Sequence, residues 1–190
     1  MIKKNWKFIF IYASFILLTF KVLALDDSDI FFESVFFTAV KKSNYEKASE
    51  LIEKGIPLNI IDSKNMSLLA YALANDDEQM FELLLKNGAN VNEIILDKTS
   101  LLSFYIKSQR TELLEQLIKN GANVNFQDNT GMTALMHAIE SMNLNAVKIL
   151  INYDFEKKLN DYAGKTILDY ANNSRNTYIK ELIKDLNISF

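Results

Sequence analysis

The sequence predicts an all-α protein, a solenoid of stacked helix-turn-helix units with short β-hairpin fingers and helical caps. The run Gly-Ala-Asn-Val-Asn occurs twice, opening at Gly88 and Gly121, which are 33 residues apart. A fixed period of this length is typical of stacked repeat arrays. The same step aligns a second row, formed by Leu69, Leu102, Leu135 and Leu168. Two rows in one register indicate that a single structural unit recurs along the chain.

Two further segments share this register. Residues 133–138 read Thr-Ala-Leu-Met-His-Ala, and residues 166–171 read Thr-Ile-Leu-Asp-Tyr-Ala. With the period and the Gly-Ala-Asn-Val-Asn run, they make the chain resemble the ankyrin-repeat family from Ser34 to Leu186. The resemblance implies helix-turn-helix units joined by β-hairpin fingers, binding to other proteins, and no enzymatic activity.

The chain departs from the family's Thr-Pro-Leu-His signature, because its only proline is Pro57. The histidine position is occupied by Ala70, Ser103, Met136 and Asp169. We therefore expect the helix-start hydrogen bonds associated with that histidine to be missing, and the repeats to be less stable than consensus ones.

On this register, residues 25–190 form one repeat domain. Its units cover about 30–62, 63–95, 96–128 and 129–161, and a C-terminal cap covers 162–190. Each unit is expected to hold two helices followed by an extended finger. The best-formed unit predicts a finger over 128–132, a first helix over 133–141 and a second helix over 144–152.

Glycine marks the end of the second helices, at Gly55, Gly88 and Gly121. The residue just past a helix commonly takes the left-handed conformation, which glycine adopts without steric cost. Asp154 replaces glycine in the fourth unit. Aspartate tolerates that conformation, so we expect the turn to persist there.

The second helices also predict where the stack ends. Two inward positions, four residues apart, are apolar in three successive units and lysine in the last one. They are Phe81 and Leu85, Leu114 and Ile118, Val147 and Ile151, and finally Lys180 and Lys184. A C-terminal cap over Thr166–Leu186 follows, because a stack needs a polar outer face at its end. Residues 27–42, apolar nearly all round, are expected to fold back as an N-terminal cap.

The first 24 residues predict an export signal. Three lysines lie within the first seven residues, residues 8–20 form an uninterrupted weakly polar to apolar run, and Val22-Leu23-Ala24 suits a signal peptidase. The run would span about 20 Å as a helix, against a hydrocarbon core of about 30 Å. We expect cleavage after Ala24 and an exported, periplasmic or secreted product. The alternative is an uncleaved membrane anchor formed by residues 8–20, the only case in which we expect membrane contact.

Charge and cysteine content restrict the partners. Removal of the signal's four lysines from 21 basic residues leaves 17 against 24 acidic ones, a net charge of −7. An anionic surface without a basic stripe makes nucleic acid an unfavourable partner. The chain has no cysteine, so its stability must come from stacking rather than from disulfides.

Residues that could carry chemistry are few, and we expect no catalytic, cofactor-binding or metal-binding residues and no small-molecule substrate. His137 is the only histidine, and no phosphate-binding loop or two-histidine metal motif occurs. Its place is taken by Tyr71, Phe104 and Tyr170 in other units, which indicates packing or surface rather than a catalytic base. A carboxylate-pair hydrolase would fit the residue types alone, but no spacing pairs the carboxylates.

The family resemblance implies that finger tips and the exposed side of the first helices form a concave binding surface for a protein partner. The matching positions are Ser63, Lys64, Met66, Leu96, Asp97, Thr99, Asn129, Thr130, Met132, Tyr162, Ala163 and Lys165. One finger differs from its neighbours, because residues 94–96 are three consecutive aliphatics. Exposed aliphatics often mark a contact surface. Alternatively, Ile94 and Ile95 pack under neighbouring fingers and only Leu96 is exposed.

A second candidate is the aromatic row at the 33-residue step: Tyr71, Phe104, His137 and Tyr170. Aromatic side chains are enriched at binding hot spots. The other interpretation, which we favour, is that the row packs between successive first helices.

These observations predict a non-enzymatic protein-binding module that acts outside the cytoplasm. Two alternatives stay open. The domain could be a stabilising or inhibitory accessory subunit of one envelope enzyme or toxin, or a secreted factor that binds another cell's proteins.

Overall fold

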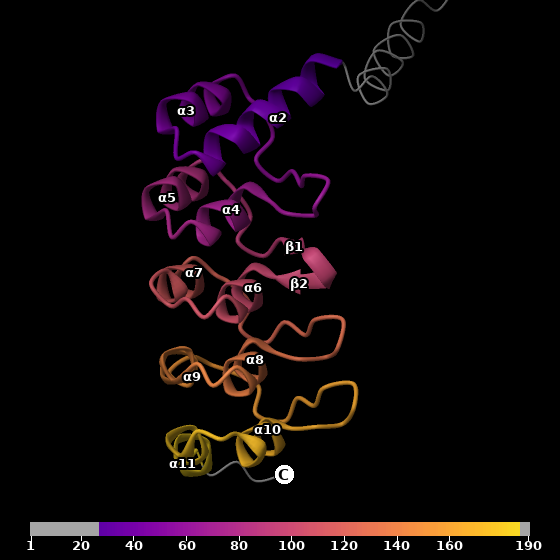
Figure 1. Ribbon diagram of the computed structural model, residues 1–190, viewed down its shortest axis with the longest axis vertical. Coiled ribbons are helices and arrows are strands. Elements are labelled where there is room, and N and C mark those ends of the chain that lie inside the picture. The colour runs from indigo at the N-terminus through magenta and orange to yellow at the C-terminus, as the bar shows by residue number, and fades with distance from the viewer. Residues whose placement is uncertain (1–26, 187–190) are drawn as a thin grey trace, which may run out of the picture.

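The computed structural model describes residues 27–186, and these form a single stack of helix pairs (Figure 1). The first helices of the pairs are α2 (Asp27–Lys41), α4 (Leu68–Ala74), α6 (Leu101–Lys107), α8 (Ala134–Glu140) and α10 (Ile167–Asn173). The second helices are α3 (Tyr45–Glu53), α5 (Glu78–Lys86), α7 (Leu114–Lys119), α9 (Leu144–Leu150) and α11 (Thr177–Asp185). The predicted all-α solenoid is confirmed. The predicted signal segment, residues 1–24, lies outside the described residues.

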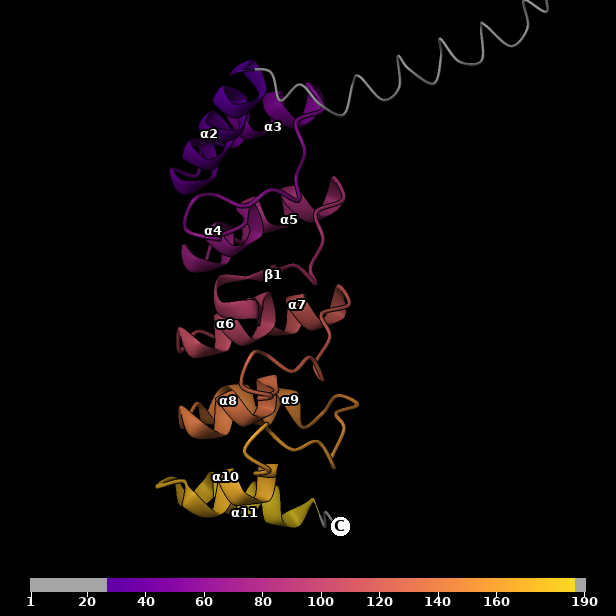
Figure 2. The same cartoon turned by 90° about the vertical axis from the view of Figure 1, so that its right-hand side faces the viewer.

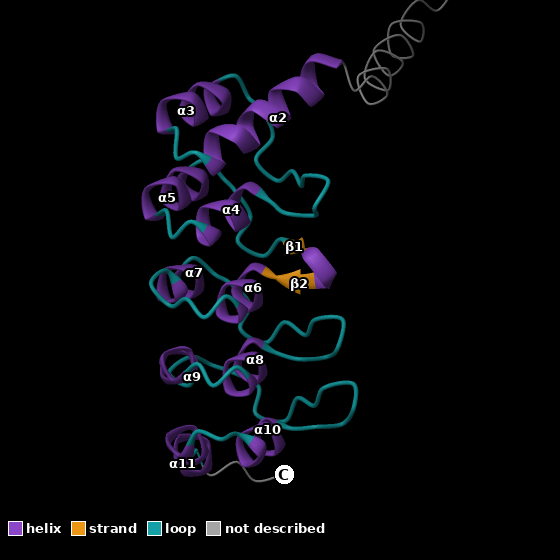
Figure 3. Cartoon of the chain, viewed as in Figure 1, coloured by secondary structure: helices purple, strands orange, loops and turns teal. Residues whose placement is uncertain are grey.

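Four loops project from the same side of the stack, next to the first helices and away from the second helices (Figures 1 and 2). We call them finger 1 (residues 61–67), finger 2 (94–100), finger 3 (127–133) and finger 4 (160–166). Only finger 2 contains strands in the described part of the chain (Figure 3), with β1 (Ile94–Ile95) antiparallel to β2 (Thr99–Ser100) around the 3-10 turn η1 (Leu96–Lys98). Fingers 1 and 4 each close with one isolated bridge, Ile61 to Ser67 and Asn160 to Thr166.

Four of the first helices, α4, α6, α8 and α10, begin at hydroxyl caps. The side-chain oxygens of Ser67, Ser100, Thr133 and Thr166 each accept the backbone N–H three residues later. Such a cap contributes about 1 kcal/mol, because it satisfies one of the unpaired N–H groups of the first turn. These caps do not involve the side chain at the position of the signature histidine. Of the four residues there, Ser103 and Asp169 bond through their side chains to the cap residue.

Glycine ends three of the second helices as predicted, with φ of 76° at Gly55, 95° at Gly88 and 92° at Gly121. In each case the next N–H returns to a helix carbonyl, for example Ala89 to Leu84. The expectation that Asp154 keeps this turn is wrong, because Asp154 is not left-handed. The N–H of Phe155 bonds to Tyr153 instead. A side chain makes the left-handed conformation costly, and the chain leaves α9 by another path.

The core is a continuous row of side chains shared between neighbouring units. Leu69, Leu102 and Leu135 are each at most 2% exposed, while Leu168, the same position in α10, is half-buried. At the far end of the described stack, Ile179 and Ile183 of α11 are fully buried and Lys184 is exposed. Within residues 27–186, no helix combines the length and apolarity that a membrane crossing requires.

Asparagines at the 33-residue step tie the units together. The side-chain oxygens of Asn59, Asn92 and Asn125 accept the N–H groups of Asn90, Asn123 and Glu156, each at 2.8 Å. The amides of Asn92 and Asn125 also donate to the carbonyls of Gly121 and Asp154 in the next unit. The Gly-Ala-Asn-Val-Asn run therefore encodes the junction between units as well as a helix end.

The unit that contains α6 and α7 departs from the others. The 33-residue register places the start of its second helix at Thr111, but α7 begins at Leu114. Arg110 occupies the cap position that Asn44, Asp77, Asn143 and Asn176 fill in other units, and arginine has no acceptor.

Tyr105 completes this irregular turn. It is fully buried and replaces the alanine present at residues 39, 72, 138 and 171. Its hydroxyl donates to Asp76 (2.7 Å) and accepts the N–H of Leu113 (3.1 Å). Burial and the Asp76 carboxylate raise the pKa of Tyr105, so the hydroxyl keeps its proton. One tyrosine thus replaces the missing cap of α7.

We predict that Tyr105→Phe lowers the free energy of unfolding by about 1 to 3 kcal/mol, because it leaves the Leu113 N–H buried without a partner. Urea unfolding followed by circular dichroism measures the change. The control is Tyr178→Phe, whose ring is 68% exposed, and it should change stability by less than about 0.5 kcal/mol. Equal effects of the two substitutions would contradict the capping role.

Candidate functional site

The candidate binding surface is formed by fingers 1–4 and the exposed sides of the first helices, and we call it the finger face (Figure 2). Two residue rows, each at the 33-residue step, define its base. One row lies in the fingers and consists of Asp62, Ile95, Asp128 and Asp161. The other lies on the first helices and is the aromatic row, Tyr71, Phe104, His137 and Tyr170.

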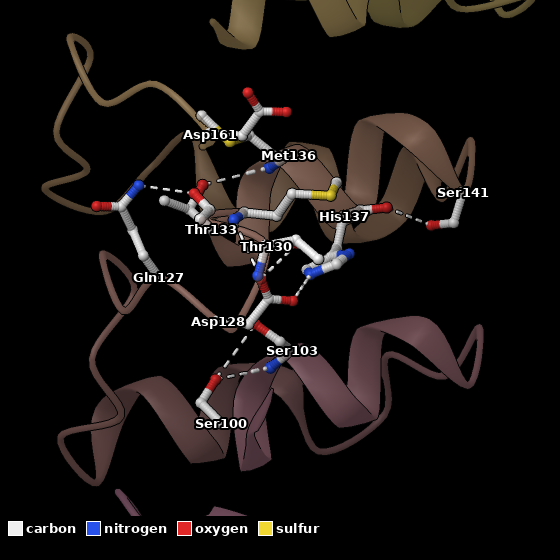
Figure 4. Close-up of polar contacts among 12 residues, drawn as sticks. Ser100, Ser103, Gln127, Asp128, Thr130, Thr133, Met136, His137, Ser141 and Asp161 are labelled. Atoms are coloured by element: carbon white, nitrogen blue, oxygen red, sulfur yellow. Dashed lines mark hydrogen bonds and ion pairs between the residues drawn. The ribbon is translucent and has the colours of Figure 1, made fainter. Parts of the chain in front are cut away.

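The two rows are hydrogen-bonded to each other in three of the four units. The Tyr71 and Tyr170 hydroxyls donate to Asp62 and Asp161, each at 2.6 Å. His137 Nε2 lies 2.7 Å from Asp128 (Figure 4). In finger 2 both partners are apolar, because Ile95 and Phe104 occupy these positions. In three of the four units the aromatic row therefore holds a finger against its own first helix. Tyr71, Phe104 and Tyr170 are half-buried, and His137 is buried.

The aspartates also shape the finger turns. Asp128 accepts the N–H group of Thr130 (Figure 4) and also that of Met132. Asp62 and Asp161 accept the corresponding groups of their fingers. Ile95 has no acceptor to offer. Backbone pairing of β1 with β2 holds finger 2 instead, with Asp97 and Lys98 in the left-handed conformation.

Hydrogen bonding shifts the pKa values of these groups. Burial acts to raise the pKa of Asp62, but donors from Tyr71, Met66, Lys64 and Lys41 outweigh it and hold the pKa at about 2. For His137 the balance differs. Burial lowers its pKa, and the nearby Asp128 carboxylate only partly opposes this. His137 is therefore neutral at pH 7.

A cavity of about 450 Å³ lies beside this pair, between fingers 2 and 3 and helices α6 and α8. Its charged lining includes Asp97, Lys107 and Glu140, and its uncharged lining includes Asn129, Thr130 and Ser141. The Thr130 hydroxyl donates to Asp128 and the Ser141 hydroxyl donates to the His137 carbonyl. Within residues 27–186, no group of three or more His, Asp or Glu is placed to hold a metal ion.

The structure places most predicted surface residues on the finger face. Ser63, Lys64, Leu96, Asp97, Asn129, Thr130, Tyr162, Ala163 and Lys165 are exposed, and Met66 is half-buried. The expectation of exposure is wrong for Thr99 and Met132, which are 4% and 7% exposed. The backbone of Thr99 pairs with Ile95 in the hairpin, and the backbone of Met132 pairs with Asp128.

Finger 2 exposes two of its three aliphatics. Ile94 is 54% exposed and Leu96 is 41% exposed, while Ile95 is buried. The alternative in which Ile94 packs beneath a neighbouring finger is therefore wrong. Sequence reasoning missed Ile61, which is also 54% exposed and lies 33 residues before Ile94. The repeat register contained this signal, since it aligns the two isoleucines on adjacent fingers.

Glu93, next to β1, is the second residue that sequence reasoning missed. Its position is apolar in the other units, where it holds Ile60, Phe126 and Leu159. One carboxylate oxygen, Oε2, is buried without a hydrogen-bond partner. Burial raises the pKa of Glu93, and the Ser67 hydroxyl opposes this only in part.

A comparison with family models identifies the class of protein. The model described as ankyrin repeats (3 copies) matches residues 14–94 and 102–190. The chain therefore belongs to the ankyrin-repeat family. Ankyrin repeats generally bind protein partners, and proteins built from them are generally interaction modules rather than enzymes. A comparison with curated proteins finds no match to the chain.

We predict that His137→Tyr keeps stability near neutral pH and removes one component of its pH dependence. Tyrosine forms this bond to aspartate in two other units, and it does not titrate near pH 6. In the parent, the unfolded histidine binds a proton near pH 6.5 and the folded one only at lower pH. Parental stability should therefore fall as the pH drops below 6.5. Urea unfolding at several pH values tests this, and an unchanged slope in the variant would contradict it.

We predict that Glu93→Leu raises the free energy of unfolding at pH 7 by about 1 to 3 kcal/mol, because it removes an unpaired buried oxygen. The folded pKa of Glu93 lies above the reference value of 4.5. The contribution of Glu93 to the free energy of unfolding is therefore largest below pH 4.5, and it is lost as the pH rises through the folded pKa. The variant should lack this loss. The control is Glu181→Leu, at an exposed site on α11; a similar gain there would point to a nonspecific effect.

Proposed function

We propose that this chain is an exported, non-enzymatic module that binds a protein partner through its finger face. The observation that carries the proposal is the exposure of Ile61, Ile94 and Leu96 on adjoining fingers. Exposed neighbouring aliphatics reduce solubility, and such patches are typical of interaction sites. Several fingers and first helices together offer room for an interface of at least about 1,000 Å².

Export is supported by the sequence of residues 1–24, with its lysines, its apolar run of 13 residues and its small residue at Ala24. The lack of cysteine is compatible with an oxidising compartment, since stacking replaces disulfides as the source of stability. We place the module in the periplasm or outside the producing cell.

The proposal that the chain is not an enzyme is supported by the environment of His137, its only histidine. Burial keeps His137 neutral, and its Nε2 is engaged by Asp128. The nearby hydroxyls of Thr130 and Ser141 bond to Asp128 and to a backbone carbonyl rather than to the imidazole. A histidine base activates a nucleophile through a direct hydrogen bond, and neither hydroxyl makes one to the His137 imidazole.

We predict that the chain beginning at Leu25, immobilised and exposed to envelope and culture-supernatant extracts, retains one protein that a Leu96→Asp variant loses. A charge in the middle of the exposed aliphatics should prevent their burial against the partner. Mass spectrometry identifies the retained protein. Its origin separates an envelope enzyme from a protein of another cell.

The matched control is Asn145→Asp, which adds the same charge at an exposed site on α9, away from the fingers. Circular dichroism first establishes that all three proteins are equally folded. Retention of the same proteins by the parent and by Leu96→Asp would show that the finger face is not the binding surface.

A further inference from the structure

Fingers 1 and 2 are hydrogen-bonded to each other. The Leu96 N–H donates to the Asn65 carbonyl at 3.0 Å, which joins the tips of the two fingers. Ile61, Ile94 and Leu96 are exposed on this joined surface, and we call them the aliphatic ridge. The other large hydrophobics exposed within residues 31–186 are Phe31, Met142, Tyr162 and Tyr178, which lie elsewhere on the stack.

The charges beside the ridge are mainly positive. Lys64 and Lys98 are exposed at the two finger tips, with Asp97 as the exposed acid between them. The other carboxylate of these fingers, Asp62, is bonded to Tyr71, to Lys41 and to two backbone N–H groups. The exposed charges at the two finger tips are thus two lysines and one aspartate, with the half-buried Glu93 next to Ile94, on a chain whose net charge is −3.

A larger group of acidic residues lies away from the fingers. Asp76, Asp77, Glu78 and Glu82 line a cavity of about 590 Å³ at the turn between α4 and α5. The fingers leave from the opposite ends of the first helices, as Figure 1 shows. A partner that approaches the ridge therefore meets the lysines first, and one that approaches the inter-helix turns meets carboxylates.

We propose that the aliphatic ridge, flanked by Lys64 and Lys98, binds a partner segment that presents aliphatic or aromatic side chains between acidic residues. This inference rests on the proposed protein-binding function and specifies the chemistry of the partner. Burial of the ridge supplies affinity, while the lysines favour acidic segments and disfavour basic ones.

A cationic aliphatic surface also suits an anionic membrane, but the ridge fits a protein segment better. Asp97 lies at the tip of finger 2, next to Leu96, where headgroup phosphates would repel it. The negative net charge of the chain opposes approach to an anionic bilayer. A peptide can hold a donor against Asp97 and carboxylates against the two lysines at fixed positions, whereas the headgroups of a fluid bilayer have no fixed arrangement.

The test uses a phage library of random 12-residue peptides, selected on the full chain and counter-selected on an Ile94→Ser/Leu96→Ser variant. We expect the enriched peptides to combine Asp or Glu with aliphatic or aromatic residues. Affinity of the best peptide should fall about tenfold or more in Lys64→Glu/Lys98→Glu, and should weaken in the parent as salt rises. The matched control is Lys148→Glu/Lys184→Glu, at exposed sites on α9 and α11, which should bind like the parent.

Three results would overturn the ridge proposal. Basic peptides, or peptides that bind the ridge variants as well as the parent, would leave the protein-binding function standing but assign it to another surface. No enrichment over the counter-selected variant would reject the ridge, and the extract experiment would then decide the function independently. The third result would come from sedimentation with vesicles of phosphatidylglycerol and phosphatidylcholine. If the parent binds these vesicles and the Ile94→Ser/Leu96→Ser variant does not, the ridge binds a membrane rather than a protein segment.

Discussion

The fold depends on one constraint, which is that no unit can bury its own apolar face. Each helix pair is too small to enclose a core, so its leucine is buried only when the next pair packs against it. Leu69, Leu102 and Leu135 meet this condition and are almost inaccessible, whereas Leu168 in α10 is half-buried. Stability is therefore a property of the junctions between units, and the asparagine and aspartate hydrogen bonds act at these junctions and at the fingers.

The departures from the repeat pattern gather in and next to one unit. Glu93, Ile95, Tyr105 and Arg110 each replace a residue type that recurs elsewhere at the same position. The same segment carries the only described hairpin and two of the three ridge residues. Real proteins relax local rules mainly at functional sites. The irregular unit is thus the part of the array in which sequence has been adjusted for something other than regular stacking.

The 33-residue register is sufficient to predict the architecture, the helix pairs and the glycine turns, because each is a local feature repeated in phase. It also places Ile94 and Leu96 on a finger. It does not predict the burial of Thr99 and Met132, since the direction of a side chain in a short finger depends on which backbone pairs form. The register does not predict the bonds between the aspartates and the aromatic row either. The two partners are nine residues apart, and nothing in the sequence of a turn indicates which side chain its aspartate will bond. Asp154 is a further example, because an aspartate can adopt the left-handed conformation but does not adopt it at this position.

The asparagine junctions have a consequence for how such an array can change in length. Asn59, Asn92 and Asn125 present the same acceptor to the next unit, so a duplicated 33-residue segment inserted among these units would find its contacts already in place. The series stops at Lys158, the next position in the row, which offers no acceptor. Gene duplication could therefore lengthen this protein from within, but a unit added beyond Lys158 would require a new junction.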